Sequence, residues 1–280
     1  MKVLVTGANG QLGYDVIEGL KLRNIECCGT TRNDFDLCDF TSAEKFITAF
    51  HPDVIIHCAA YTAVDKAEEE KELCRAVNAV GTENIAKICK KINAKMLYIS
   101  TDYVFDGTKK GFYEVDDMPN PINVYGQTKL EGEQAVQKIL DRYFIVRISW
   151  VFGEHGNNFV KTMLRLGKER KEINVVSDQV GSPTYTVDLA QLLIDMIQTD
   201  KYGIYHATNE GECSWAEFAE EIFKVAGINV KINYITTREY YTKAKRPENS
   251  RMSKYRLTCN GFQVLDGWKN AIKRYIEGVN

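Results

Sequence analysis

The first 22 residues constrain the fold of this chain more than any other segment. A short apolar run, Lys2–Thr6, leads into a turn with glycines at positions 7, 10 and 13, and an amphipathic stretch, Gln11–Leu22, follows. Glycines allow a tight turn and let a pyrophosphate approach the backbone, while a helix N-terminus offers free N–H groups and a favourable dipole. This order favours dinucleotide binding over a plain strand-to-helix turn. The residues predicted to contact the cofactor here are Gly7, Gly10, Gln11, Leu12 and Gly13.

The same alternation of apolar runs and amphipathic stretches continues through the first half of the chain. The predicted strands are Lys2–Thr6, Ile25–Gly29, Val54–Cys58, Met96–Ser100 and Phe144–Ile148. The predicted helices between them are Gln11–Leu22, Thr41–Phe50, Asp65–Lys91 and Tyr125–Leu140. Strands that are apolar throughout are covered on both faces, so the pattern predicts an α/β protein with a Rossmann-type doubly wound parallel sheet. Ligands bind such sheets at the carboxyl edge of the strands.

The second half of the chain is less regular and predicts a smaller C-terminal substrate-binding domain. Strands are expected at Asn174–Ser177, Ile204–Ala207 and Val230–Ile235, and helices at Val187–Thr199, Trp215–Ala226 and Trp268–Gly278. No internal repeat or low-complexity linker separates the two halves. We therefore expect an NAD(P)-binding Rossmann domain over 1–150, and a substrate-binding part over 151–280 that is interleaved with returning Rossmann elements.

Composition narrows the class of protein and its location. The formal net charge of −2 provides no basic field for nucleic acid, and no run of about 18 apolar residues predicts a membrane span. The segment Lys2–Gly7 leaves no room for an apolar signal peptide. The eight cysteines show no zinc-site spacing and are expected to be reduced thiols. The sequence therefore predicts a soluble cytoplasmic protein with no nucleic-acid partner, no membrane and no bound metal.

The end of the second predicted strand bears on the choice of cofactor. An acidic residue at this place binds the adenosine ribose of NAD, whereas an arginine pairs with the 2′-phosphate of NADP. The chain presents Arg32 first, and Asp34 and Asp36 only afterwards. This order favours NADPH, with NADH as the alternative, unless Arg32 is an ordinary loop charge.

A tyrosine and a lysine lie four residues apart at the start of the fourth predicted helix. Tyr125 and Lys129 share a helix face at this spacing. A phenol with a pKa near 10 exchanges protons poorly at neutral pH, and a nearby fixed positive charge is expected to lower its pKa. Both residues are also expected to contact the cofactor. On its own the spacing occurs by chance in surface helices, but its place downstream of a glycine turn favours catalysis.

Small and hydroxyl side chains stand where the third and fourth predicted strands end. Thr101 is expected to donate to the oxygen of a reacting carbonyl, although a threonine there also suits a turn or cap. Ala59 and Ala60 would let the backbone lie against the cofactor. His57 falls inside an apolar run, which is typical of a buried histidine with its hydrogen bonds satisfied and not of a catalyst.

Taken together, these motifs resemble the extended short-chain dehydrogenase/reductases, and among them the dTDP-4-dehydrorhamnose reductases. The matching segments extend over most of the chain. They are Gly7–Gly13, Cys58–Glu68, Ile99–Gly107, Tyr125–Glu133, Arg147–Gly153, Asp178–Thr184 and Arg246–Ser250. The resemblance implies reduction of the C4 keto group of a 4-keto-6-deoxy sugar nucleotide with NAD(P)H, where Tyr125 protonates O4.

The resemblance also implies roles for residues to which the local motifs assign none. Asp102 would order the active site, and Asp39 and Tyr61 would contact the cofactor. The expected substrate-binding residues are Thr101, Val64, Trp150 and Arg246. Trp150 otherwise suits a core aromatic, and Arg246 otherwise suits a surface charge.

Several other functions are consistent with the same motifs. A sugar-nucleotide epimerase uses the same Tyr/Lys pair, whereas a dehydratase needs an acid where Tyr103 stands. A regulatory subunit that binds nucleotide without catalysis is a third possibility, which the intact Thr101, Tyr125 and Lys129 disfavour. Some relatives bind magnesium through acidic residues at a dimer interface. Of those acidic positions, this chain has only Asp15 and Asp188. The oligomer is therefore expected to be either a monomer or a homodimer.

Overall fold

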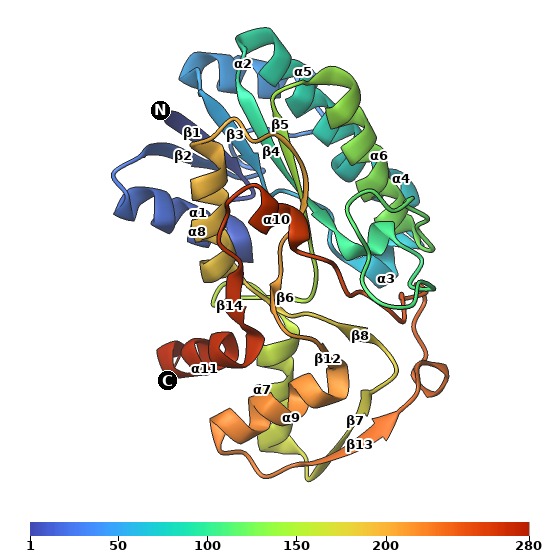
Figure 1. Cartoon of the computed structure of the whole chain (residues 1–280). Coiled ribbons are helices and arrows are strands. Elements are labelled where there is room, and N and C mark those ends of the chain that lie inside the picture. Colours follow the sequence, from blue (N-terminus) through green and yellow to red (C-terminus); the bar gives the residue numbers. More distant parts are fainter. Residues whose placement is uncertain (280) are drawn as a thin grey trace.

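A parallel sheet of six strands forms the centre of the molecule (Figure 1), and the computed structural model describes residues 1–279. The strand order is β10-β5-β4-β3-β1-β2, and each neighbouring pair is parallel. The bounds of the strands are β1 Lys2–Thr6, β2 Glu26–Thr30, β3 Val54–His57, β4 Lys95–Thr101, β5 Tyr143–Ile148 and β10 Gly203–His206. The predicted α/β fold is confirmed, since all five strands predicted in the first half belong to this sheet. The order reverses between β1 and β3, which opens a crevice for ligands at the carboxyl edge.

Helices cover both faces of the sheet, as the apolar strands require. Helices α1 (Gln11–Leu22) and α8 (Thr186–Ile197) pack on one face, where they share a core with β1, β4 and β5. Helices α2 (Phe40–Phe50), α5 (Thr82–Ile92) and α6 (Val124–Ile139) cover the other face. Figure 1 shows the two layers on opposite sides of the strands.

The prediction of one continuous helix over Asp65–Lys91 is wrong, because the structure divides this segment into several elements. The structure has α3 (Val64–Ala67), α4 (Lys71–Arg75), a π-helical turn η1 (Ala76–Gly81) and then α5. The π turn carries Asn78, whose side-chain amide accepts from the Tyr61 N–H at 2.8 Å and donates to the Tyr61 carbonyl at 3.1 Å. These bonds join groups 17 residues apart, so the helical period of the sequence does not reveal them.

A second group of elements stands below the sheet in Figure 1. Helices α7 (Phe159–Glu169), α9 (Trp215–Ala226) and α11 (Trp268–Val279) share an apolar core with the parallel pair β7 (Glu172–Val176) and β13 (Lys231–Ile235). Helix α8 and strand β10 lie between these elements in the sequence but pack with the central sheet. The chain therefore crosses between the two parts more than once.

The remaining elements are short and connect the two parts. They are η2 Asp102–Val104, β6 Val151–Phe152, β8 Val180–Gly181, β9 Thr184–Tyr185, β11 Asn209–Glu210, β12 Cys213–Ser214, η3 Thr237–Glu239, α10 Tyr255–Cys259 and β14 Leu265–Gly267. Over residues 1–279, every helix is too short or too polar to span a lipid bilayer.

Candidate active site

A cavity of about 630 Å³ opens at the carboxyl edge of the central sheet. Residues at or just beyond the ends of β1, β2, β3, β4 and β5 line it, together with residues from α6 and the start of α9. The sequence-predicted residues that line it are Gly7, Gly10, Gln11, Leu12, Gly13, Arg32, Ala59, Ala60, Val64, Thr101, Asp102, Tyr125, Lys129 and Trp150. The fold therefore brings most of the candidate site to one place.

The glycine turn forms one end of the cavity and lies directly against the backbone after β3. Gly7 has a φ of +68°, and a Cβ added there would lie 2.8 Å from both the Cα and the N of Ala59. Only glycine meets both conditions at this position. Helix α1 begins at Gln11 without a side-chain cap, so its first N–H groups face the cavity mouth unblocked by its own side chains. This arrangement fits a pyrophosphate.

Tyr125 and Lys129 come from the first turns of α6, where the Asn123 side chain caps the helix by accepting from the Gly126 N–H at 2.7 Å. Lys129 is buried, and its Nζ donates to the Ile99 carbonyl at 2.7 Å. The same Nζ lies 4.0 Å from the centroid of the Tyr98 ring, which is a favourable cation–π distance. These two contacts fix the lysine head group at the wall of the cavity.

The expectation that Lys129 lowers the pKa of Tyr125 is wrong for this structure. Burial raises the pKa of the Tyr125 phenol well above its usual value, and the negative charge of Asp102 raises it further. Burial also lowers the pKa of Lys129 to about 7, because an ammonium loses its hydration there. The lysine is thus only partly charged near neutral pH, and the tyrosine stays protonated. A protonated phenol is the state that a proton donor needs.

Thr101 and Asp102 stand at the end of β4, beside Tyr125. The Thr101 hydroxyl donates to the Asp102 carboxylate at 3.0 Å, and hydrogen bonding to Thr101 partly offsets the upward shift in the pKa of Tyr125. Asp102 is 3 % exposed, and burial raises its carboxyl pKa to about 6. The site thus combines two hydroxyls, a carboxyl and an amine in a desolvated pocket.

The raised pKa of Asp102 predicts a pH dependence of stability. Because its folded-state pKa of about 6 exceeds the ordinary aspartate pKa of 3.8, the folded state binds this proton more tightly than the unfolded state. Stability is then lost as pH rises from about 4 to 6, by up to about 3 kcal/mol. We expect Asp102→Asn to remove this loss when urea unfolding is compared at pH 4 and pH 7. Identical changes in wild type and variant between the two pH values would contradict the assignment.

Three predicted site residues have side chains outside the lining of the cavity. The Tyr61 hydroxyl donates to Glu70 at 2.5 Å, and the ring packs in a small cluster with Cys74 and Val77. Asp39 caps α2 by accepting from the N–H groups of Thr41 and Ser42. Each of these side chains thus has a polar partner within the protein.

Arg246 is the third of these residues. Its guanidinium pairs with the Asp65 carboxylate, at 2.7 Å from Nη2 and 3.2 Å from Nη1. This pair joins the segment after β13 to α3 and uses guanidinium donors that were expected to bind the substrate.

His57 is a buried structural residue, as the sequence predicts. Its Nδ1 lies 2.7 Å from the Thr6 hydroxyl and its Nε2 lies 3.2 Å from the Thr82 hydroxyl. Burial lowers its pKa to about 3, so the ring is neutral. Its hydrogen bonds are satisfied within the core between β1, β3 and α5.

Sequence reasoning missed Trp215, which lines the cavity next to Trp150. The two indoles are stacked, with centroids 3.7 Å apart and an interplanar angle of 14°. Trp215 is the first residue of α9, after the capping box formed by Ser214 and Glu217. That capping signal locates the start of a helix, but nothing in the local pattern shows that this helix end faces the cavity.

A doubly wound parallel sheet with a glycine turn after β1, and a half-buried Tyr125 beside a buried Lys129 on α6, defines the short-chain dehydrogenase/reductase class of fold. The family model described as the RmlD substrate binding domain matches residues 1–280, and the chain belongs to this family.

Named relatives and solved structures agree with this membership. The chain is 42% identical to a dTDP-4-dehydrorhamnose reductase from Aggregatibacter actinomycetemcomitans, over 97% of each protein. A crystal structure of a dTDP-4-dehydrorhamnose reductase from Clostridium acetobutylicum matches with a TM-score of 0.98 and 45% identity, covering 100% of this chain and 99% of that one. The enzyme of that name from Bacillus anthracis, crystallised with NADP, matches with a TM-score of 0.97 and 43% identity over 99% of each chain.

Proposed function

We propose that this protein reduces the C4 keto group of dTDP-4-dehydro-L-rhamnose with NADPH and yields dTDP-L-rhamnose. The observation that carries the proposal is the convergence of Tyr125, Thr101 and Lys129 in one cavity with the glycine turn. The names of the full-length relatives supply the substrate class.

The residues of the cavity fit a nicotinamide dinucleotide. The open N-terminus of α1 and the glycine turn against Ala59 suit its pyrophosphate, and Arg32 lines the cavity near the end of β2. The nearby Asp34 carboxylate is engaged within its own loop, where it accepts from the Thr31 N–H at 2.7 Å and hydroxyl at 3.0 Å. This leaves Arg32 as the charged group for the adenosine ribose, which favours NADPH. When bound, the cofactor supplies the hydride that reduces the carbonyl carbon.

The side chains of this protein then manage the proton and the oxygen. Tyr125 donates its phenolic proton to O4 of the sugar, and the Thr101 hydroxyl, which donates to Asp102 in this structure, turns to donate a hydrogen bond to the same oxygen as it gains charge. We assign Lys129, which lines the same cavity, to the nicotinamide ribose. We assign Val64 and Trp150 to the sugar nucleotide, with residues 151–280 as the part that selects it.

Replacing Arg32 tests the choice of cofactor. We expect Arg32→Ala to raise the KM for NADPH by about ten-fold, because a charge-assisted hydrogen bond to the 2′-phosphate is lost. The KM for NADH, which has no such phosphate, should change by less than about two-fold. Initial rates with each cofactor measure both values. Equal changes in the two KM values would show that Arg32 does not bind the phosphate.

Loss of absorbance at 340 nm tests the proposed reaction directly. The protein is mixed with NADPH or with NADH, and dTDP-4-keto-6-deoxyglucose is supplied with or without a 3,5-epimerase. Consumption that requires the epimerised sugar supports the reductase and ranks the two cofactors. Folded protein that consumes neither cofactor would favour an epimerase or a non-catalytic nucleotide-binding subunit.

We also infer a cytoplasmic location. Over the part of the chain that the structure describes, all eight cysteines are free thiols, which suits a reducing compartment. Whether the protein is a monomer or a homodimer stays a prediction that sedimentation would test.

A further inference from the structure

The backbone of Trp150 is held in an unfavourable conformation at the edge of the cavity. It lies two residues after the end of β5 and has a φ of +49°, which is uncommon for a residue other than glycine. Such conformations persist where surrounding contacts hold them, and they concentrate at functional sites. The contacts of the Trp150 side chain therefore indicate the function of this backbone conformation.

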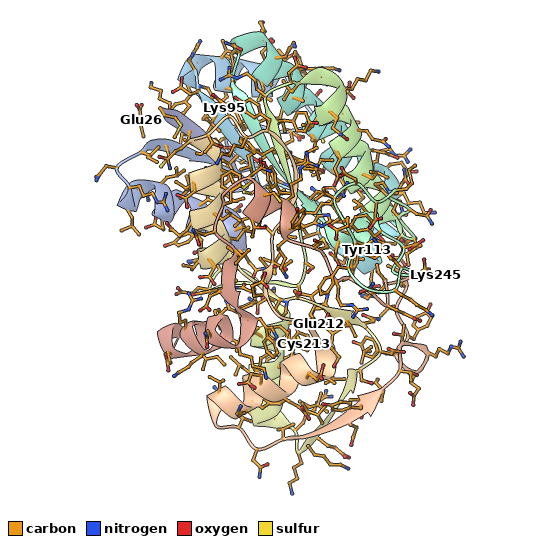
Figure 2. The ribbon with its side chains drawn as sticks, in the orientation of Figure 1. Glu26, Lys95, Tyr113, Glu212, Cys213 and Lys245 are labelled. Atoms are coloured by element: carbon orange, nitrogen blue, oxygen red, sulfur yellow. The ribbon has the colours of Figure 1, made fainter. Side chains whose placement is uncertain are left out.

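The short strand β8 contacts the indole of Trp150, and its partner β12 leads into Trp215. Strands β8 and β12 pair antiparallel, with Gly181 opposite Cys213 and Val180 opposite Ser214. A Cβ added to Gly181 would lie 2.8 to 3.1 Å from three atoms of the Trp150 ring, so the bare backbone of β8 presses on the indole. The chain leaves β12 into α9, whose first residue is the stacked Trp215. Figure 2 labels Cys213 where this pair of strands lies, between the sheet and the C-terminal helices.

Strand β5, which leads to Trp150, is separated in the sheet from the strand that precedes the glycine turn. Strand β5 is the neighbour of β4, and Ile148 is in register with Thr101. The glycine turn follows β1, which lies on the other side of β4 with β3 between them. The end of β5, from which the chain leads to Trp150, therefore lies on the side of β4 away from β1. That side is left for the sugar nucleotide.

We propose that Trp215 is a substrate-binding residue, which forms with Trp150 an aromatic wall for the apolar face of the 6-deoxyhexose. This inference rests on the proposed function and names a residue of its substrate site. Aromatic rings offer a large rigid apolar surface, and the C–H groups and C6 methyl of such a sugar are the parts that contact it without losing hydrogen bonds. Trp215 has two roles here: it contributes its own surface and it keeps Trp150 in place.

Truncation of Trp215 tests the proposal. We expect Trp215→Ala to raise the KM for the sugar nucleotide by about ten-fold, with less than about two-fold change in the KM for NADPH. Trp215→Phe keeps an aromatic face and should recover most of the affinity. The matched control is Trp268→Phe, because Trp268 is buried in the core of α9 and α11 outside the cavity. It should leave both KM values unchanged.

A second readout keeps the result independent of turnover and of folding. Near-ultraviolet circular dichroism should show that Trp215→Ala loses the signal of the stacked indoles while its far-ultraviolet spectrum stays that of wild type. Calorimetry with dTDP-L-rhamnose should show weaker binding to Trp215→Ala and unchanged binding to Trp268→Phe. If wild type binds this ligand but shows no reduction, the proposed function fails while the binding comparison still decides the role of Trp215. An unchanged sugar-nucleotide KM or affinity in Trp215→Ala, or an equal rise in both KM values, would overturn the inference.

Discussion

Tyr125→Phe is expected to lower kcat by about 10²- to 10⁴-fold, the usual contribution of a positioned proton donor. The side chain is half-buried, and desolvation of the phenol together with the charge of Asp102 keeps its pKa well above the usual range, so it is protonated at neutral pH. Phenylalanine keeps the ring but has no proton to give to O4. Because the change leaves the glycine turn and Arg32 untouched, the Kd for NADPH should stay within about two-fold of wild type. Steady-state rates at 340 nm and a fluorescence titration with NADPH measure the two quantities.

A neighbouring tyrosine provides the matched control for this prediction. Tyr103 also lines the cavity, and its ring meets the ring of Tyr125 edge-on at a centroid distance of 5.9 Å. Tyr103→Phe removes a hydroxyl from the same pocket and should leave kcat within about two-fold of wild type. The assignment of the donor would be wrong if Tyr125→Phe kept normal turnover, or if Tyr103→Phe lost as much.

Arg147→Met is expected to lower the free energy of unfolding by about 3–5 kcal/mol. Arg147 on β5 and Glu133 on α6 form a two-point ion pair, at 2.9 Å from Nε and 2.7 Å from Nη2, and each side chain is at most 2 % exposed. Removing the guanidinium leaves the carboxylate buried without its partner, which costs more than the pair itself contributes. The guanidinium also lies 5.0 Å from the Phe105 ring centroid, and that contact is lost too. Urea unfolding followed by far-ultraviolet circular dichroism measures the change.

Two further variants distinguish the stability cost of a buried unpaired charge from the stability cost of lost packing. Arg147→Met combined with Glu133→Leu removes both charges and should recover most of the lost stability. Arg165→Met breaks the exposed Arg165–Glu169 pair on α7 and should cost less than about 1 kcal/mol. A double variant as unstable as Arg147→Met would show that the cost lies in packing and not in the unpaired carboxylate.

The parts of the fold that were predicted correctly depend on patterns within one segment. The apolar run Lys2–Thr6 and the amphipathic stretch Gln11–Leu22 have the bounds of β1 and α1. The predicted helix Asp65–Lys91 failed because Asn78 and Tyr61 bond across a loop and a π turn interrupts the helical period. A repeat of 3.6 residues carries no information about a bond of this kind.

The candidate site likewise has residues that local patterns predicted correctly and residues for which they failed. The spacing of Gly7, Gly10 and Gly13 and the four-residue step from Tyr125 to Lys129 are local, and both reach the cavity as expected. Arg246 and Asp39 have the expected chemistry, but Asp65 and the N-terminus of α2 engage their polar groups. Whether a charged side chain finds a partner depends on which distant segment lies beside it.

The sequence by itself determined the parallel sheet, the edge at which ligands bind and the residue types that meet there, because period and spacing act within single elements. Only the tertiary structure decided the protonation of the Tyr/Lys pair and the contact of Trp150 with Trp215, 65 positions later in the chain. A pKa follows from how much water packing removes around a group, and a stack of two indoles follows from where two segments meet. Both are properties of the folded whole, since neither burial nor long-range contact exists in an isolated segment.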